Sequence, residues 1–448
     1  MTDVLAEAAL IAYRGAGHLL APFAGWLLRA RARRGKEDPA RRGERLGHAA
    51  RPRPEGELVW VHAASVGETM SVLPVVDWLT RNGVAVLLTS GTVTSAALAQ
   101  TRLPAGAFHQ YVPMDLAPFI GRFLDHWRPT AALFVESEIW PTTVVELDRR
   151  GIPQVLVNAR LSAKSHRRWL QAPQLARSIF SRFSLVLAQS QQDAARFAEV
   201  GVADPQVTGN IKFDCQPLAV DAAELARLRG VIGDRPILLA ASTHPGEEAV
   251  IADAARRIAA SVPGLLSIIV PRHPDRRADI AADLATRGFA VATRSHGADP
   301  NAATDIYLAD TLGELGLFYR LAPVAFIGGS LIPAGGHNPI EAAQLQTAVL
   351  HGPHVHNARE IFAALDSGGG ALMIDDAKTL AAAATRLLTS PAAAAAMAGA
   401  GADIVLSGRG ALARTRAHIV DRVMVGLAPA DGPWLDDAAS TMLGHAAG

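Results

Sequence analysis

From Leu58 onward, short runs of apolar residues alternate with longer stretches whose apolar residues recur every three or four positions. A short continuous apolar run is typical of a strand buried on both faces, and the longer period is typical of a helix packed on a sheet. This alternation predicts parallel sheets covered by helices on both sides. The predicted strands are 58–64, 84–90, 131–136, 154–158 and 185–189, then 237–241, 265–270, 291–294, 305–308, 324–327 and 348–351.

The two halves of this pattern open in the same way. Trp60-Val-His-Ala-Ala-Ser65 is followed by Gly67-Glu68, and Leu238-Leu-Ala-Ala-Ser242 is followed by Gly246-Glu247. Each segment predicts a strand, a loop of small residues and then a helix, which is how a doubly wound domain begins. We therefore expect an α/β fold of two Rossmann-like domains facing across a cleft, with the ligand at the carboxyl ends of the strands.

The same pattern suggests where the chain divides. We expect a membrane-associated helix and basic segment over residues 1–53, a first domain over 54–215 and a second over 216–425. Residues 214–236, which carry Asp, Pro and Ala, are interpreted as the connection between the domains. Residues 426–448 are expected to form a loop-like tail.

The N-terminal segment from Val4 to Leu28 is mostly apolar, but Arg14 lies near its middle. A central arginine costs about 2.5–3.5 kcal/mol in a membrane span. At 100° per residue the polar side chains fall on one narrow stripe, a pattern typical of a helix lying at a membrane interface. We expect such a helix, kinked at Pro22, and leave open whether it spans the bilayer. The stripe consists of Asp3, Glu7, Arg14, His18 and Arg29.

A basic stretch follows the apolar segment, with ten Lys and Arg against three acids between Arg29 and Arg53. Basic residues beside an apolar segment favour an anionic membrane surface and the cytoplasmic side. Two alternatives stay open: a helix packed on the protein body, and a secretory signal. The second is weakly supported, because no basic residue precedes the apolar run and no convincing cleavage site follows it.

Composition narrows the classes of function. The chain has 448 residues, 50% hydrophobic and 19% charged, enough to fill more than one core. A formal net charge of +1 gives no reason to expect a nucleic acid partner. The single cysteine, Cys215, cannot form an internal disulfide, which fits a reducing compartment. No Cys/His spacing resembles a zinc site, and no acidic run resembles a calcium loop.

Polar residues follow the predicted strands of the first half, where ligands bind in doubly wound folds. Glu68 lies near a helix start, where it could cap backbone amides or accept a proton from a hydroxyl, and spacing favours neither role. Glu136 and Glu138 follow a buried strand, and we expect one to orient a lysine or substrate hydroxyl while the other caps a helix. Lys212 and Arg160 could hold an anionic substrate or form surface ion pairs.

The second half carries loops suited to a nucleotide sugar. Arg272 has prolines nearby on both sides, so it suits a rigid phosphate clamp. The stretch Asp310–Glu314 begins a helix whose N-terminal amides suit an anion. The segment from Gly328 to Glu341 carries two glycine pairs that let backbone amides approach a phosphate. Its glutamate, Glu341, can bind the hydroxyl pair of a ribose.

These loops and their flanks read, in chain order, VHAASVGET, ESEIWP, NARLS, GNIKFD, STHPGEE, PRHP, DTLGEL, FIGGSL, GGHNPIEAA and GPHVHNARE. So many segments in one order resemble the 3-deoxy-D-manno-octulosonic acid (Kdo) transferases of lipopolysaccharide synthesis. The resemblance implies a GT-B fold and an inverting transfer of Kdo from CMP-Kdo to a lipid A precursor, lipid IVA. It places the reaction at the cytoplasmic face of the inner membrane, and the family needs no metal.

The resemblance also implies roles for individual residues. Glu68 corresponds to the family's proton acceptor, and Glu136 and Lys212 to residues that stabilise the transition state. The first domain would bind the acceptor and the second the CMP-sugar. The residues that correspond to the CMP-binding segments are Pro271, Arg272, Leu312, Gly313, Glu314, Asn338, Pro339, Ile340 and Glu341.

Two other functions stay open. A GT-B relative that uses a UDP-sugar, or an epimerase of that fold, would carry similar loops, and competition by CMP against UDP separates these. A non-catalytic nucleotide-sugar-binding module on a membrane is a different class. The presence of Glu68, Glu136 and Lys212 argues against it, because a protein without activity tends to lose such groups.

Overall fold

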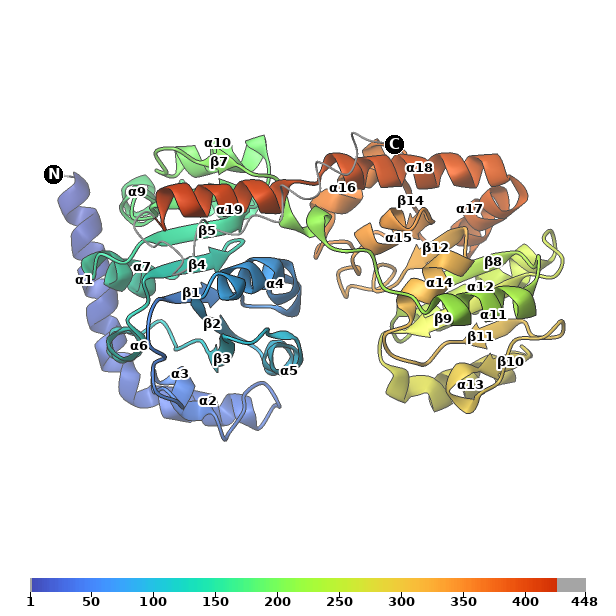
Figure 1. Cartoon of the computed structure of the whole chain (residues 1–448), viewed down its shortest axis with the longest axis horizontal. Coiled ribbons are helices and arrows are strands. Elements are labelled where there is room, and N and C mark those ends of the chain that lie inside the picture. Colours follow the sequence, from blue (N-terminus) through green and yellow to red (C-terminus); the bar gives the residue numbers. More distant parts are fainter. Residues whose placement is uncertain (1, 425–448) are drawn as a thin grey trace. The chain divides into compact units, whose positions relative to one another are not determined.

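The structure, a computed structural model, describes residues 2–424, so the predicted tail over 426–448 lies outside the described residues. Two compact units make up the described chain (Figure 1): unit 1 comprises residues 2–214 and 409–424, and unit 2 comprises Cys215–Gly408. The second domain was predicted to continue to residue 425. Instead, the helix Ala411–Arg422 joins unit 1, where Asp214 accepts hydrogen bonds from the backbone of Gly410 and Leu412.

Unit 1 contains a seven-stranded parallel sheet with the order β3-β2-β1-β4-β5-β6-β7. Strand order reverses between β1 and β4, and ligands of doubly wound folds bind beyond the carboxyl ends of strands at such a point. The strands are β1 (Leu58–His62), β2 (Ala85–Ser90), β3 (Ala107–Tyr111), β4 (Ala131–Val135), β5 (Gln154–Ala159), β6 (Leu185–Ala188) and β7 (Gln206–Val207).

Helices cover both faces of this sheet (Figure 1). They are α1 (Thr2–Leu20), α2 (Ala24–Ala32), α3 (Arg42–Arg45), α4 (Val66–Arg81), α5 (Val93–Arg102), α6 (Ala117–Trp127), α7 (Pro141–Arg149), α8 (Ala163–Trp169), α9 (Pro173–Phe180), α10 (Gln191–Glu199) and α19 (Ala411–Arg422), with 3-10 turns η1 (Ala21–Phe23) and η2 (Ile211–Asp214).

Unit 2 contains a second seven-stranded parallel sheet with the order β10-β11-β9-β8-β12-β13-β14. Its order reverses between β8 and β12, as that of unit 1 does between β1 and β4. The strands are β8 (Ile237–Thr243), β9 (Leu266–Pro271), β10 (Val291–Thr293), β11 (Ile306–Leu308), β12 (Val324–Ile327), β13 (Ala348–His351) and β14 (Ala371–Met373).

The helices of unit 2 are α11 (Ala222–Ile232), α12 (Glu247–Ala259), α13 (Arg277–Thr286), α14 (Leu315–Leu321), α15 (Ile340–Gln344), α16 (Arg359–Ser367), α17 (Ala377–Thr389) and α18 (Pro391–Ser407), with 3-10 turns η3 (Pro274–Arg276) and η4 (Arg294–His296). Within residues 2–424, one helical stretch, Pro391–Arg422, has the length and apolar composition needed to cross a membrane. Its two parts, α18 and α19, belong to different units.

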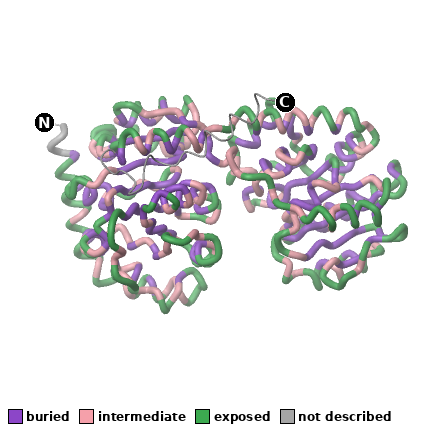
Figure 2. Tube along the Cα trace, viewed as in Figure 1, coloured by how far each residue is buried: buried purple, intermediate pink, exposed green. Residues whose placement is uncertain are grey.

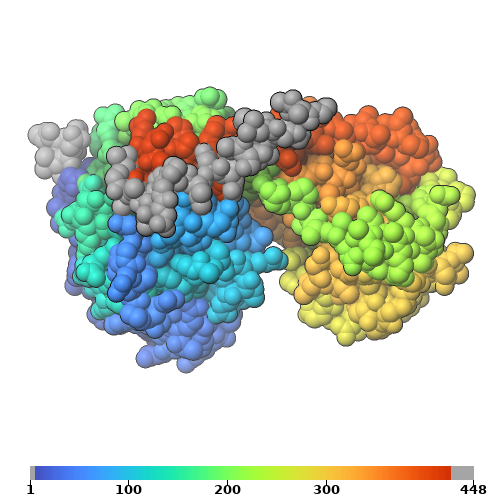
Figure 3. Space-filling view, viewed as in Figure 1, coloured from blue at the N-terminus to red at the C-terminus, as the bar shows by residue number. Residues whose placement is uncertain are grey.

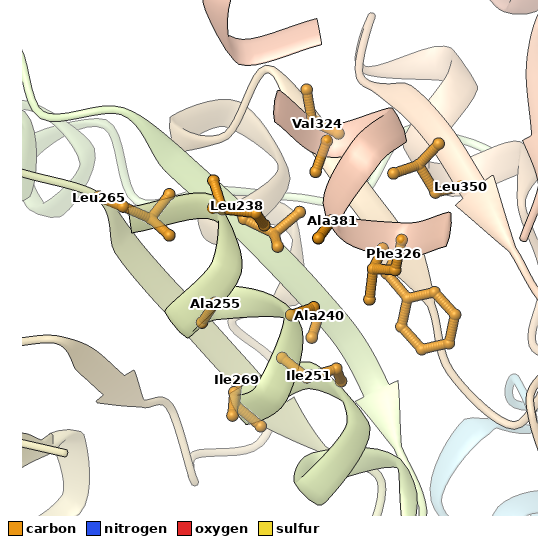
Figure 4. Close-up of a cluster of buried hydrophobic side chains, with 14 of the residues drawn as sticks. Leu238, Ala240, Ile251, Ala255, Leu265, Ile269, Val324, Phe326, Leu350 and Ala381 are labelled. Carbon is orange, nitrogen blue, oxygen red and sulfur yellow. The ribbon is translucent and has the colours of Figure 1, made fainter. Parts of the chain in front are cut away.

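Each sheet forms the centre of its unit, with buried strands and exposed outer helix faces (Figure 2). In unit 2 apolar side chains of β8, β9, β12 and β13 pack against α12 and α17 (Figure 4). Full burial of a Val, Leu, Ile or Phe side chain in this core contributes roughly 1.5–3 kcal/mol. The residues labelled in that view are Leu238, Ala240, Ile251, Ala255, Leu265, Ile269, Val324, Phe326, Leu350 and Ala381.

All eleven predicted strands exist, and three strands of the described chain were missed: β3, β7 and β14. Each missed strand lies at an edge of its sheet. An edge strand has one neighbour and need not be buried on both faces, so it lacks the continuous apolar run that marks a central strand. The predicted connection over 214–236 also contains a helix of unit 2, α11.

The N-terminal helix α1 packs on unit 1, against α6, α7 and α9 (Figure 1). Two residues of its polar stripe bind the protein body, since Arg14 pairs with Glu146 and Glu7 with Arg182, whereas His18 is exposed. The turn η1, which contains Pro22, interrupts the helix where a kink was predicted. The alternative of a helix packed on the body is therefore correct for α1, which packs through the buried Ala6 and Leu10 and through these two ion pairs. Other large apolar side chains, such as Ile11, Tyr13 and Leu19, are exposed.

Part of the basic stretch is also used within unit 1. Arg31 and Arg45 pair with Glu37, whose side chain is almost completely buried. Arg41 forms a bidentate pair with Glu44, with N–O distances of 2.8 Å. Arg41 and Arg45 also donate to the carbonyl oxygens of His109 and Val112, which holds the segment between α2 and β1 to the body. Only the remaining basic residues are therefore available to attract anionic lipid.

Candidate active site

Glu68 is the third residue of α4, in the loop-to-helix turn after β1. Ser65 caps this helix: its Oγ accepts from the Glu68 N–H (3.3 Å) and donates to Glu68 Oε1 (2.8 Å). The Ala64 N–H donates to Glu68 Oε2 (2.8 Å). The cap interpretation of Glu68 is therefore realised in the structure.

The electrostatic surroundings of Glu68 also suit a base. Burial raises its pKa, and the charges of Glu136 and Glu138 raise it further, against smaller opposing effects of the hydrogen bonds from Ser65 and Ala64. A carboxylate whose pKa is raised accepts a proton more readily once it is ionised. Glu68 can therefore act both as a helix cap and as a proton acceptor, the two roles that the sequence left open.

Glu136 and Lys212 lie 76 positions apart in the chain and form an ion pair with a distance of 2.6 Å between Nζ and Oε1. Glu136 directly follows β4 and has a φ of 60°, a conformation that costs a non-glycine residue energy and is often kept at functional sites. Lys212 comes from η2, whose first residue, Ile211, donates its N–H to Asn158 Oδ1 (3.1 Å). Of the three predicted catalytic residues, Glu136 and Lys212 are thus in direct contact. The third, Glu68, is affected by the charge of Glu136, which raises its pKa.

Glu138 belongs to the same cluster. Its Oε2 lies 3.4 Å from Nε2 of the buried His62 and accepts from the Trp140 indole N–H at 2.9 Å. Burial alone would raise the pKa of Glu138, but the close contact with the His62 imidazole and the hydrogen bond from Trp140 outweigh it and lower that pKa. His62 was missed as a site residue because it lies inside a buried strand, where no spacing distinguishes it from a core histidine.

In unit 2, the charge of Arg272 acts on the carboxyl group of Glu341. Arg272 follows Pro271 at the end of β9, donates its backbone N–H to Thr243 O (2.9 Å) and has an exposed side chain. Burial raises the pKa of Glu341 to about 7, and the charge of Arg272 opposes the rise. Glu341 is held at the start of α15 by the segment Asn338-Pro339-Ile340, in which Asn338 Oδ1 accepts from the Ile340 N–H (3.2 Å).

The segment Leu312-Gly313-Glu314 is arranged differently. Leu312 is 80% exposed and Gly313 has φ of 84°, while Glu314 forms a bidentate pair with Arg294 that lowers the pKa of Glu314. Within residues 2–424, no hydrogen bond or ion pair joins Glu314 to Arg272 or Glu341. Arg294 lies at the end of the short strand β10, and no sequence signal pointed to it.

The glycine loop after β12 differs from its prediction. The Glu247 carboxylate, fully buried, accepts the N–H groups of Gly329 (2.7 Å), Ser330 (3.1 Å) and Leu331 (3.0 Å). It also accepts the N–H of His244 (2.9 Å). The expectation that amides of this loop hold a phosphate is wrong for these three, because a carboxylate of the chain itself already occupies them.

Groups of three or more His, Cys, Asp or Glu that could hold a metal ion are absent from the described part of the chain.

Comparison with known proteins gives consistent matches. A family described as 3-deoxy-D-manno-octulosonic-acid transferase (kdotransferase) matches residues 40–215. The 3-deoxy-D-manno-octulosonic acid transferase of Haemophilus influenzae is 35% identical over 394 residues, which cover 87% of this chain and 92% of that protein. The transferase of the same name from Bordetella pertussis is 37% identical over 370 residues, 79% of this chain and 85% of that protein.

Among solved structures, the fold is similar to that of a putative UDP-N-acetylglucosamine 2-epimerase from Listeria monocytogenes. The TM-score is 0.56 at 15% sequence identity, over 84% of this chain and 100% of that one. A glycosyltransferase from Rickettsia africae gives a TM-score of 0.54 at 13% identity, over 83% of this chain and 99% of that one. At these identities the likeness shows the fold alone.

Proposed function

The chain belongs to the 3-deoxy-D-manno-octulosonic acid (Kdo) transferase family, and we propose that it moves Kdo from CMP-Kdo to a lipid A precursor, lipid IVA, with Glu68 as the general base. It is a glycosyltransferase with two Rossmann-like sheets of the GT-B type. The observation that carries the proposal is the raised pKa of Glu68 beside the Glu136–Lys212 ion pair.

The proposed mechanism is a direct displacement. Glu68 takes the proton of a glucosamine hydroxyl, whose oxygen attacks the anomeric carbon of Kdo, and CMP leaves with inversion. Such a transition state resembles an oxocarbenium ion, as in glycoside hydrolysis. Lys212, held by Glu136, and Arg272, with its exposed guanidinium, supply positive charge for the Kdo carboxylate and the leaving phosphate.

On the donor side, we propose that unit 2 binds CMP through the residues matched to the family. Arg272 and Glu341 are supported by the effect of the Arg272 charge on Glu341 and by the perturbed pKa of Glu341. Leu312, Gly313 and Glu314 are supported only by the family pattern, as are Asn338, Pro339 and Ile340. CMP-Kdo is a substrate, and the proposal includes neither a metal nor a cofactor.

The test is an assay of the purified full chain with CMP-Kdo and lipid IVA, read by mass spectrometry of the lipid. We expect addition of Kdo that free CMP inhibits and free UDP does not. Transfer from a UDP-sugar, or inhibition by UDP in place of CMP, would contradict the proposed donor. Binding of CMP-Kdo without any transfer to lipid IVA would favour a non-catalytic module.

We also propose that α1 and α2 bind the cytoplasmic face of the inner membrane through an apolar outer face. Arg14 and Glu7 of α1 pair with unit 1, while several large apolar side chains of the N-terminal segment are exposed. This segment, blue in Figure 3, lies at the surface of unit 1. Leu19 is 77% exposed, Trp26 70% and Phe23 66%. Exposed apolar patches of this kind mark interaction surfaces. The apolar outer face consists of Ile11, Tyr13, Leu19, Leu20, Phe23, Trp26 and Leu27.

Exposed basic residues continue from this face. Arg29, Arg33, Arg34 and Lys36 are exposed, unlike the arginines that pair within unit 1. Each such charge adds about 1 kcal/mol of attraction to an anionic surface. The membrane partner is therefore expected to contain anionic lipid.

Flotation with lipid vesicles tests this part of the proposal. Full-length protein with Leu19→Ser, Phe23→Ser and Trp26→Ser together should lose most binding, whereas Arg33→Gln with Arg34→Gln should weaken binding to anionic vesicles only. The matched control replaces exposed apolar residues elsewhere, Val231, Met373 and Leu406, with serine. Equal flotation of the first variant and the control would contradict the anchor.

A further inference from the structure

Two histidines from different loops of unit 2 face each other. His244 follows β8 and His337 lies 93 positions later, yet their Nε2 atoms are 2.9 Å apart and their rings are stacked with an interplanar angle of 14°. Gly329 lies beside both rings: a Cβ there would be 3.3 Å from His337 and 3.4 Å from His244. Both imidazoles are partly exposed, so the pair can be reached by a ligand.

The charges around the pair favour its neutral form. Burial lowers the pKa of His337 to about 4, helped by the charges of Arg272, His244 and His273. Burial also lowers the pKa of His244, where His273 and Arg272 add to the effect and Glu247 and Glu248 oppose it. These effects favour the uncharged pair near neutral pH, and the 2.9 Å between the Nε2 atoms suits a hydrogen bond in which one imidazole donates to the other.

In this arrangement, proton uptake by the histidine pair and binding of an anion favour each other. If the pair gains a proton, each Nε2 carries an N–H, and the two donors repel each other unless an acceptor takes both. A phosphate oxygen is such an acceptor, and Arg272, whose charge already acts on both rings, supplies a further donor. The three amides of the glycine loop cannot serve here, since Glu247 occupies them.

We propose that the His244–His337 pair, together with Arg272, holds the phosphate of the CMP product and takes up one proton as that phosphate binds. This rests on the proposed function, because it deepens the donor site of the same transferase. As the bond between the anomeric carbon and the phosphate oxygen breaks, the electron pair stays on the phosphate. The phosphodiester with one negative charge becomes a monoester with up to two, and the proton taken up from solvent offsets that charge.

The experiment measures CMP binding to the full chain by calorimetry between pH 6.5 and 8.5, in two buffers that differ in ionisation enthalpy. For the wild type we expect uptake of up to one proton per CMP and an affinity that weakens as pH rises. His337→Gln and His244→Gln, which keep a donor but cannot titrate, should abolish the uptake. They should weaken CMP binding about 10–100-fold near neutral pH, the loss expected for a hydrogen bond to a charged group.

Two controls separate the phosphate from the rest of the nucleotide. Cytidine, which lacks the phosphate, should bind the wild type and both variants equally, and His296→Gln, at an exposed position in η4, should behave as the wild type. Proton uptake that persists in both substituted proteins, or an equal loss of cytidine binding, would overturn the inference while leaving the transferase intact. Failure of the wild type to bind CMP at all would overturn the proposed donor itself.

Discussion

Glu68 and Glu247 occupy the same place in the two units, and the structure uses them differently. Each follows the first strand of its sheet, a loop of small residues and a glycine, and each lies in the first turn of a helix. Glu247 is fully buried and its two oxygens accept four backbone N–H groups. Glu68 is partly exposed and accepts two hydrogen bonds, both from its own turn.

The difference lies in the neighbouring loop, not in the glutamate. In unit 2 the loop after β12 turns its amides toward Glu247, so the carboxylate braces two loops. In unit 1 the loop after β4 instead brings Glu136 and Glu138, whose charges raise the pKa of Glu68. The carboxylate of Glu247, whose oxygens accept four hydrogen bonds, stabilises the fold. The carboxylate of Glu68 lies beside other negative charges, and these favour its protonation.

The largest effect on stability is expected from Glu247→Ala. Each buried N–H left without a partner costs about 1–3 kcal/mol. The N–H groups of Gly329 and Ser330 are buried, so unit 2 should lose at least about 2 kcal/mol from these two alone. Glu68→Ala, which removes bonds at a helix cap, should cost only about 1 kcal/mol. Hydrogen exchange of the amides in β8 and β12 measures the loss, with Asp253→Ala, a surface acid near Arg287, as the control. Similar losses for the two glutamates would break the comparison.

Burial destabilises the ionised form of Glu341 in unit 2. Substitution of Glu341 should therefore change how the free energy of unfolding depends on pH. With a pKa of about 7 in the folded chain against an ordinary 4.5, it is protonated in both states below pH 4.5 and ionised in both above pH 7. Wild-type stability at this site is therefore lost as pH rises through that window, by up to about 3 kcal/mol.

Glu341→Gln removes this cost. Calorimetric unfolding should show the variant more stable than the wild type at pH 8, with the difference disappearing near pH 4.5. A difference of constant size at both pH values would show that packing, and not ionisation, separates the two proteins.

The smallest effect is expected on the pH dependence of activity, when the negative charge of Glu138 is removed. Glu138→Gln removes one negative charge that raises the pKa of Glu68, so that pKa should fall. The acid limb of kcat/KM should then move to lower pH, whatever the change in maximal rate. Glu55→Gln, at an exposed position in unit 1, is the control. If the acid limb stays in place, or moves to higher pH, the charge of Glu138 does not raise the pKa of Glu68.

The sequence predicted the central strands and the loops that carry the polar residues, because burial and loop position leave clear patterns along the chain. It did not predict which side chains meet. Lys212 reaches Glu136 across 76 positions and His337 reaches His244 across 93, distances that no spacing rule covers. Glu247 was visible as an echo of Glu68, but its buried position depends on a loop some 80 residues away.

Two further features depend on packing between distant segments. The helix α19 returns to unit 1 after the chain has passed through unit 2, and its own amphipathic pattern does not say on which unit it packs. The polar residues of α1 were identified from the sequence, but the pairing of Arg14 and Glu7 with unit 1 depends on Glu146 and Arg182, far along the chain.

The central claim, that Glu68 is the base, is tested most directly by Glu68→Ala in single-turnover transfer from CMP-Kdo to lipid IVA, with CMP affinity measured on the same protein. Loss of a general base typically reduces the rate about 10²–10⁴-fold. The account predicts a loss of that size with CMP affinity unchanged, and near wild-type transfer by Ser65→Ala, which keeps the carboxylate but removes one of its cap partners. Transfer by Glu68→Ala at close to the wild-type rate would contradict it.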